Sequence, residues 1–82
     1  MEKQYGIAYL DFRGKGFTDE CPWILDDLSS SDATYLTAQL VTNGTAKKAV
    51  MFWYVDAIPE DATWSWVYDH KMVERTRECG GK

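Results

Sequence analysis

The side chains with the greatest catalytic potential in this sequence are one imidazole and two thiols. His70 is the only histidine, and Cys21 and Cys79 are the only cysteines. A cysteine beside a histidine can act as a nucleophile, but no cysteine or serine stands at a recognised nucleophile spacing from His70. Three such side chains also fall short of the four ligands of a structural zinc site. The sequence therefore predicts a protein that is not an enzyme and holds no metal.

Acidic side chains gather at two places along the chain. Asp26, Asp27 and Asp32 precede or begin a predicted helix, and Asp56, Glu60 and Asp61 lie in a predicted turn. Carboxylates can bind a hard cation, but acids at a helix start also complement the helix dipole while they stay hydrated. The second group is most simply a feature that aids solubility. We keep both groups as secondary candidates for contact with a partner.

Two further patterns suggest ligands only weakly. Gly14-Lys15-Gly16 lacks the third glycine and the following helix of a dinucleotide-binding fingerprint, so we expect no cofactor. Trp64, Trp66 and Tyr68 alternate as the aromatic residues on the sheet of an RNA-binding module do. Because a predicted helix lies over these positions, we expect the three rings to belong to the core.

Composition and charge bound the remaining possibilities. The chain has 82 residues, a length that suits a single domain over residues 1–82, with a loose tail expected from about residue 76. Its net charge is −4 at pH 7. Affinity for nucleic acid comes largely from lysine and arginine. These are scattered here, with no run longer than Lys47-Lys48. Direct binding of nucleic acid is therefore not expected.

The apolar segments are short. The longest run, Ala49 to Val55, is far below the roughly 20 residues that cross a bilayer, and the first residues lack the apolar stretch of a secretion signal. We expect a cytoplasmic protein without membrane contact, in which Cys21 and Cys79 are unpaired. A disulfide between them is the alternative for a secreted protein.

The first half of the chain predicts a strand, a loop and a helix. Residues 5–13 read as a strand that ends at the glycines 14 and 16. Residues 17–28 contain Pro22 and are predicted as a covering loop with a short edge strand. Ser29 and Asp32 resemble a capping box, and Asn43-Gly44 is typical of a helix end, so a helix is expected over 30–43. It presents Ala33, Leu36 and Leu40 on one face.

The second half predicts an antiparallel hairpin, with strands over 48–56 and 63–73. The fold class is then α+β: a two-layer design in which one helix packs on a small antiparallel or mixed sheet. The predicted order is strand, loop with edge strand, helix, strand, strand.

Alternation along the two hairpin strands predicts which residues share a face. The face under the helix would hold Met51, Trp53, Val55, Trp64, Trp66, Tyr68 and Met72, with Trp53 opposite Trp66 across the strands. The outer face would carry an apolar patch of Val50, Phe52, Tyr54 and Val67 within a rim of charged residues. An exposed apolar patch with a polar rim is the usual anatomy of an interface.

This patch leads to the functional expectation. It would bind a protein partner or a second copy of the chain, unless residues 17–28 fold over it. The sequence thus favours a small, acidic, non-enzymatic protein-binding module that inhibits or antagonises its partner, by analogy with small acidic proteins of phages and other mobile elements. The alternative is a role related to nucleic acid, either single-strand binding through aromatic residues or DNA mimicry through the acidic groups.

Overall fold

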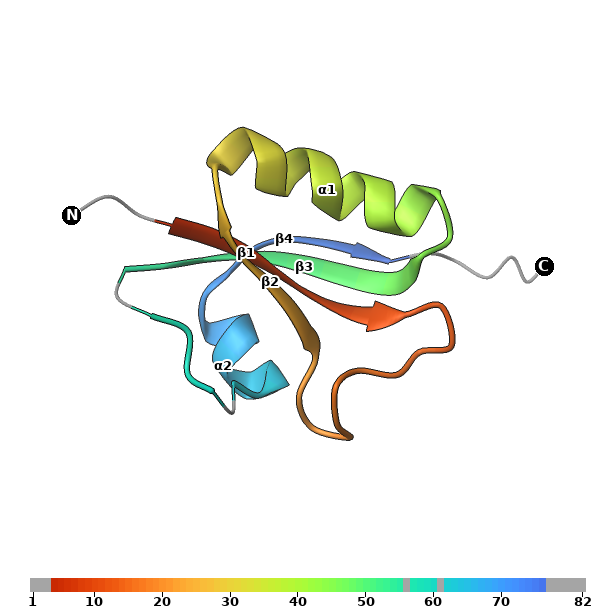
Figure 1. Cartoon of the computed structure of the whole chain (residues 1–82), viewed down its shortest axis with the longest axis horizontal. Helices are drawn as coiled ribbons and strands as arrows, with labels where there is room; N and C mark the ends of the chain where they lie inside the picture. The colour runs from red at the N-terminus through yellow and green to blue at the C-terminus, as the bar shows by residue number, and fades with distance from the viewer. Residues whose placement is uncertain (1–3, 56, 61, 77–82) are drawn as a thin grey trace.

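Four strands and two helices make up the fold in the computed structural model, which describes residues 4–55, 57–60 and 62–76. In chain order they are β1 (Gln4–Asp11), β2 (Trp23–Leu28), α1 (Ser30–Thr42), β3 (Ala46–Tyr54), α2 (Trp64–Asp69) and β4 (Lys71–Thr76). The strands form one antiparallel sheet in the order β2-β1-β3-β4. Helix α1 lies on one face of the sheet and the shorter α2 on the other (Figure 1). The α+β class is confirmed, and α2 is an addition that the sequence pattern did not predict.

Helix α1 follows its sequence signals closely. The Ser29 hydroxyl accepts a hydrogen bond from the Asp32 backbone N–H at 3.2 Å, which caps the first turn. Gly44, at φ 85°, takes the left-handed conformation that ends the helix after Thr42. Ala33 and Thr37 are buried against the sheet, and the Thr37 hydroxyl donates to the Ala33 carbonyl oxygen. The predicted span of 30–43 is therefore confirmed to within one residue.

Strand β1 ends two residues earlier than predicted because Asp11 starts a tight turn. Its carboxylate accepts hydrogen bonds from the backbone N–H groups of Lys15 and Arg13, at 3.0 and 2.9 Å. These bonds lower the pKa of Asp11, with the Lys15 N–H as the largest cause, because they favour the charged carboxylate. Gly14 completes the turn at φ 83°. Strand β2 then runs along the edge of the sheet, directly after Pro22, as predicted for 17–28.

The core has two halves, one on each face of the sheet. Neighbouring residues of β1 and β3 point to opposite faces, so Ile7 and Ala8 contribute to different halves. The half under α1 consists of Ile7, Ala33, Ala49 and Met51, and the half under α2 consists of Ala8, Val50, Phe52, Tyr54 and Val67. Both faces are thus covered, in contrast to the predicted two layers.

The predicted strand over 63–73 is wrong for its first part, which forms α2. The Thr63 hydroxyl accepts from the Trp66 N–H at 3.5 Å and caps the helix. Aromatic rings four residues apart then meet on its surface, Trp64 with Tyr68 at 5.6 Å and Trp66 with His70 at 4.2 Å. These contacts and the burial of Val67 outweigh the β-propensity of the segment.

The predicted pairing of Trp53 with Trp66 is wrong for the same reason. Strand β3 pairs with β4 instead, with Met51 opposite Val73. The Trp66 ring meets Phe52 edge-on at 5.3 Å from α2, whereas Trp53 lies 6.2 Å from the His70 ring. Of the residues predicted under the helix, Met51 is fully buried, the three tryptophans are half-buried, and Val55, Tyr68 and Met72 are exposed.

Candidate functional site

The predicted outer patch lies in the core, so its expected exposure is wrong. Val50, Phe52 and Val67 have 0% exposure and Tyr54 has 5%. Helix α2 covers the patch and brings Val67 into it, and Ile24 of β2 packs at its side. Side chains with no solvent exposure cannot make first contact with a partner, and therefore the surface that could bind one must be sought elsewhere.

The predicted acidic groups do not gather into one site. Asp26 and Asp27 are exposed near the end of β2, where Asp27, at φ 64°, donates its backbone N–H to the Tyr54 hydroxyl at 3.1 Å. Asp32 is exposed in the first turn of α1, and Glu60 is exposed in the loop before α2. Asp56 and Asp61 lie outside the described residues. Within the described ranges, no three acidic, histidine or cysteine side chains form a group that could hold a metal ion.

A concave surface of about 300 Å³ opens between the β1–β2 loop and the loop that precedes α2. We call it the apolar hollow, and it is lined by Phe17, Cys21, Pro22, Trp23, Ile24, Pro59, Glu60 and Ala62. Ile24 and Ala62 join its floor to the folded core, since Ile24 packs on the α2 half of the core and Ala62 is buried. The hollow is therefore built on the start of the edge strand β2, on the β1–β2 loop and on the loop before α2.

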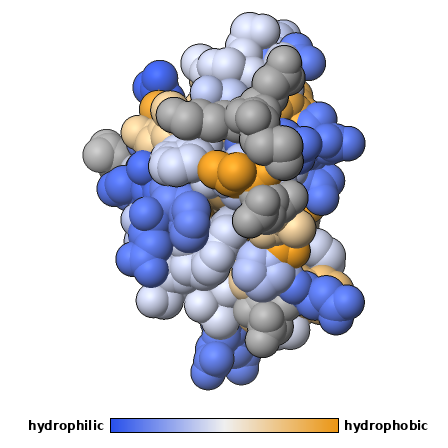
Figure 2. Space-filling model, turned by 90° about the vertical axis from the view of Figure 1, so that its left-hand side faces the viewer, coloured by the Kyte–Doolittle hydropathy of each residue, from blue (hydrophilic) through white to orange (hydrophobic). Residues whose placement is uncertain are grey.

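Two aromatic residues stand exposed at the rim of the apolar hollow. Phe17 is 68% exposed and Trp23 is 38% exposed, and their rings meet edge-to-face at 5.5 Å. Large apolar side chains that remain in water beside a concave apolar wall are typical of binding surfaces. Figure 2 shows the side of the molecule that is at the left of Figure 1, where small hydrophobic areas lie among hydrophilic ones.

The loop that carries Phe17 is tied to the rest of the fold. The Thr18 N–H donates to the Cys21 carbonyl oxygen and the Cys21 N–H donates to the Thr18 hydroxyl, both at 3.1 Å. The Glu20 carbonyl oxygen accepts from the Trp64 N–H at 3.3 Å, which joins the loop to the start of α2. A Cβ on Gly16 would lie 2.5 Å from the Cys21 carbonyl oxygen, so only glycine allows the chain to fold back this closely.

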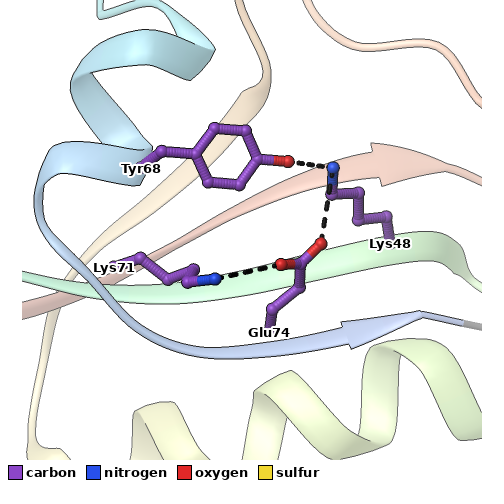
Figure 3. Close-up of polar contacts among 4 residues, drawn as sticks. All are labelled: Lys48, Tyr68, Lys71 and Glu74. Atoms are coloured by element: carbon purple, nitrogen blue, oxygen red, sulfur yellow. Dashed lines mark hydrogen bonds and ion pairs between the residues drawn. The ribbon is translucent and has the colours of Figure 1, made fainter.

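A second polar arrangement fastens α2 to the sheet. The Lys48 ammonium contacts the Tyr68 hydroxyl and lies 3.5 Å from the Glu74 carboxylate, which also pairs with Lys71 at 3.3 Å (Figure 3). The same ammonium lies 4.9 Å from the centre of the Trp64 ring and 4.8 Å from that of Tyr68, within the range of cation–π attraction. We call these five residues the Lys48 cluster.

The charge of Lys48 is favoured within this cluster. Partial burial on its own would lower the pKa of the ammonium, but the Tyr68 hydroxyl and the Glu74 carboxylate oppose that effect, and the pKa is raised. Lys48 comes from β3, Tyr68 from α2 and Glu74 from β4, so the cluster joins three elements. It therefore helps to hold α2 over the sheet, together with the core around Val67.

The histidine and the cysteines contribute to different parts of the molecule. The His70 ring stacks on Trp66, and its Nδ1 lies 2.9 Å from the Trp66 carbonyl oxygen, so the imidazole helps to close the end of α2. Cys21 lines the apolar hollow. Cys79 lies outside the described residues, and the unpaired state of the two thiols therefore stays a prediction, as does the absence of enzymatic activity.

Sequence reasoning missed Phe17 and Trp23 as site residues. A signal was present, because both stand in a segment with glycine, proline and acidic residues and without the alternation of a strand.

Neither described helix is both long and apolar enough to span a bilayer. The chain matches no protein-family model, no curated protein and no solved structure.

Proposed function

We propose that this protein is a non-enzymatic protein-binding module that inhibits or antagonises its partner, and that the apolar hollow is its contact site. The supporting observation is the pair of exposed rings, Phe17 and Trp23, at the rim of a 300 Å³ apolar concavity. Aromatic side chains provide much of the binding energy at protein interfaces. A hollow of this kind receives a side chain from the partner while the two rings cover it.

The loop that carries Phe17 supports this proposal because it is already ordered, so that binding costs less conformational entropy. Binding is weakened when a loop must be ordered on contact. Here the hydrogen bonds among Thr18, Glu20, Cys21 and Trp64 hold the loop before any partner arrives. The protein then acts as an antagonist by occupying a surface that its partner needs for another interaction.

Single-strand binding through aromatic residues has less support as an alternative. The Trp64 ring is engaged by the Lys48 ammonium, and the Trp66 ring lies against Phe52 and His70. These contacts leave less of each indole face for stacking on a base. DNA mimicry would require the acidic groups to be spaced like phosphates, and only four of the six candidate acids lie within the described residues.

The test compares three immobilised proteins in capture experiments from host extract: the wild type, Phe17→Asp and the control Tyr35→Asp. Phe17 and Tyr35 are similarly exposed, at 68% and 63%, but Tyr35 lies on α1, away from the hollow. We expect the wild type and Tyr35→Asp to capture the same protein and Phe17→Asp to lose it, with unchanged circular dichroism in all three.

The antagonist role is tested on the captured protein once it is identified. The wild type should inhibit its activity or displace one of its ligands, and Phe17→Asp should not. If Phe17→Asp captures the same proteins as the wild type, the hollow is not the contact site. If the wild type binds but has no effect on any interaction of the partner, binding stands and antagonism is refuted.

A further inference from the structure

The chemistry of the apolar hollow restricts the class of partner segment that fits it, provided that the proposed protein-binding function holds. Its wall is formed mainly by apolar side chains, from Phe17 at the rim to Ala62 at the floor, and Glu60 is its charged member. A cavity of roughly 150 Å³ can hold a benzene ring. An open hollow of about 300 Å³ therefore has room for one large apolar side chain together with the start of its neighbour.

The Glu60 carboxylate is available for a new ion pair. It is exposed, and within the described part of the chain no side chain forms a hydrogen bond or ion pair with it. In contrast, the carboxylates of Asp11 and Glu74 are already paired, with Arg13 and with two lysines. An unpaired carboxylate beside an apolar wall favours a partner that places a cation next to the apolar side chain that enters the hollow.

From this combination we infer that the hollow binds a partner segment in which a large apolar side chain stands next to a lysine or arginine. The apolar side chain enters the hollow beside the paired rings of Phe17 and Trp23, and the basic side chain pairs with Glu60. Asp19 and Glu20, which are both exposed in the β1–β2 loop, add negative charge close to the hollow. Opposite charges across an interface increase the association rate and select against acidic partners.

The test uses three capped tetrapeptides as probes: acetyl-Ser-Phe-Lys-Ser-amide, its Phe-Glu counterpart and its Ser-Lys counterpart. Each is titrated into the ¹⁵N-labelled full chain, and the backbone amide shifts of Trp23, Ile24 and Ala62 are followed by NMR. We expect the Phe-Lys peptide to bind about two- to fivefold more tightly than the Phe-Glu peptide, as befits an exposed ion pair. The Ser-Lys peptide should cause no shift at these amides.

A charge reversal at Glu60 separates the ion pair from general electrostatics. Glu60→Lys should prefer the Phe-Glu peptide, whereas the control Asp26→Lys should keep the wild-type preference. Both replace an exposed acid and change the net charge equally, but Asp26 does not line the hollow. Dispersed amide spectra show that both variants are folded.

The possible failures can be told apart. Equal affinity for the Phe-Lys and Phe-Glu peptides would overturn the inferred charge preference and leave the hollow as a site for apolar side chains. The same loss of preference in Glu60→Lys and Asp26→Lys would also overturn it, because the effect would then come from net charge. Absence of shifts with either Phe-containing peptide up to millimolar concentration would argue against the hollow itself and so against the proposed contact site.

Discussion

Phe52 is the residue whose role changes most between the sequence pattern and the structure, and substituting it tests that change. As part of an exposed patch, Phe52 could be replaced without loss of folding. In the structure its ring has 0% exposure and lies 5.3 Å from Trp66 and 6.0 Å from Tyr54. Phe52→Ala should therefore destabilise the whole domain by opening a cavity between the sheet and α2.

The expected loss is large for a chain of this size. Removing a buried phenylalanine side chain costs about 3–5 kcal/mol. A domain of 82 residues has an unfolding free energy of roughly 4–12 kcal/mol. Phe52→Ala therefore removes between a quarter of the stability and all of it. Phe52→Leu fills part of the cavity and should lose about 1–2 kcal/mol.

Urea unfolding followed by circular dichroism measures both losses. With a slope of about 1 kcal/mol per M urea for a small domain, the midpoint should fall by about 1–2 M for Phe52→Leu. For Phe52→Ala it should fall by about 3 M or more, or the folded baseline should be lost. Tyr35→Ala, at an exposed position, serves as the control and should stay within about 0.5 M. A Phe52→Ala midpoint as close to the wild type as that of the control would refute the placement of Phe52 in the core.

Three further substitutions test other contacts. Gly6→Ala places a Cβ 2.7 Å from the Phe52 ring and 2.8 Å from a backbone oxygen. Urea unfolding should therefore show a loss of about 1–3 kcal/mol in unfolding free energy. If this loss is unchanged in a Phe52→Leu background, a clash with that ring is contradicted. Ser29→Ala removes the α1 cap and should cost about 1 kcal/mol, or about 4–8 °C in melting temperature; an unchanged melting temperature would show that the cap adds nothing. The raised pKa of Lys48 means that its contribution is complete below the ordinary value of 10.5 and is lost as the pH rises through the higher folded value. The wild type should therefore lose more stability than Lys48→Met between about pH 9 and about pH 11.5 in urea titrations, and equal losses would contradict this role.

Elements with local signals could be predicted from the sequence. Helix α1 is such a case, because Ser29 at its start and Gly44 at its end act through their own backbone neighbours. Strand β3 was equally clear, since its residues suit a sheet that is covered on both faces. In these elements, local preference and tertiary contacts favour the same conformation.

Helix α2 could not be predicted because its conformation depends on distant residues. The segment Trp64–Asp69 is rich in residues that favour strands, and six residues form too short a helix to be stable alone. Lys48, which is distant in sequence, and the core around Val67 decide the outcome. Helical signals were present in the four-residue spacing of Trp64 with Tyr68 and of Trp66 with His70, and in Thr63 as an N-cap.

The wrong prediction of an exposed binding patch followed from the wrong prediction of a strand at α2. With the segment 63–73 treated as a strand, one sheet face was left uncovered, and Phe52 and Tyr54 were interpreted as a binding patch. Once α2 covers that face, the exposed aromatic pair beside the apolar hollow consists of Phe17 in the β1–β2 loop and Trp23 at the start of β2. Their exposure depends on how the loop lies against the start of α2, which no local pattern encodes.

The position of β1 inside the sheet has a consequence for synthesis on the ribosome. Strand β1 lies between β2 and β3, and it pairs with β3 across most of its length, from Gln4 opposite Tyr54 to Asp11 opposite Ala46. A nascent chain that has released only β1, β2 and α1 exposes the inner edge of β1, with its unpaired backbone groups, until β3 emerges. Such an edge can pair with another chain. During co-translational folding, the edge of β1 is therefore open to aggregation until β3, which ends at Tyr54, has left the ribosome.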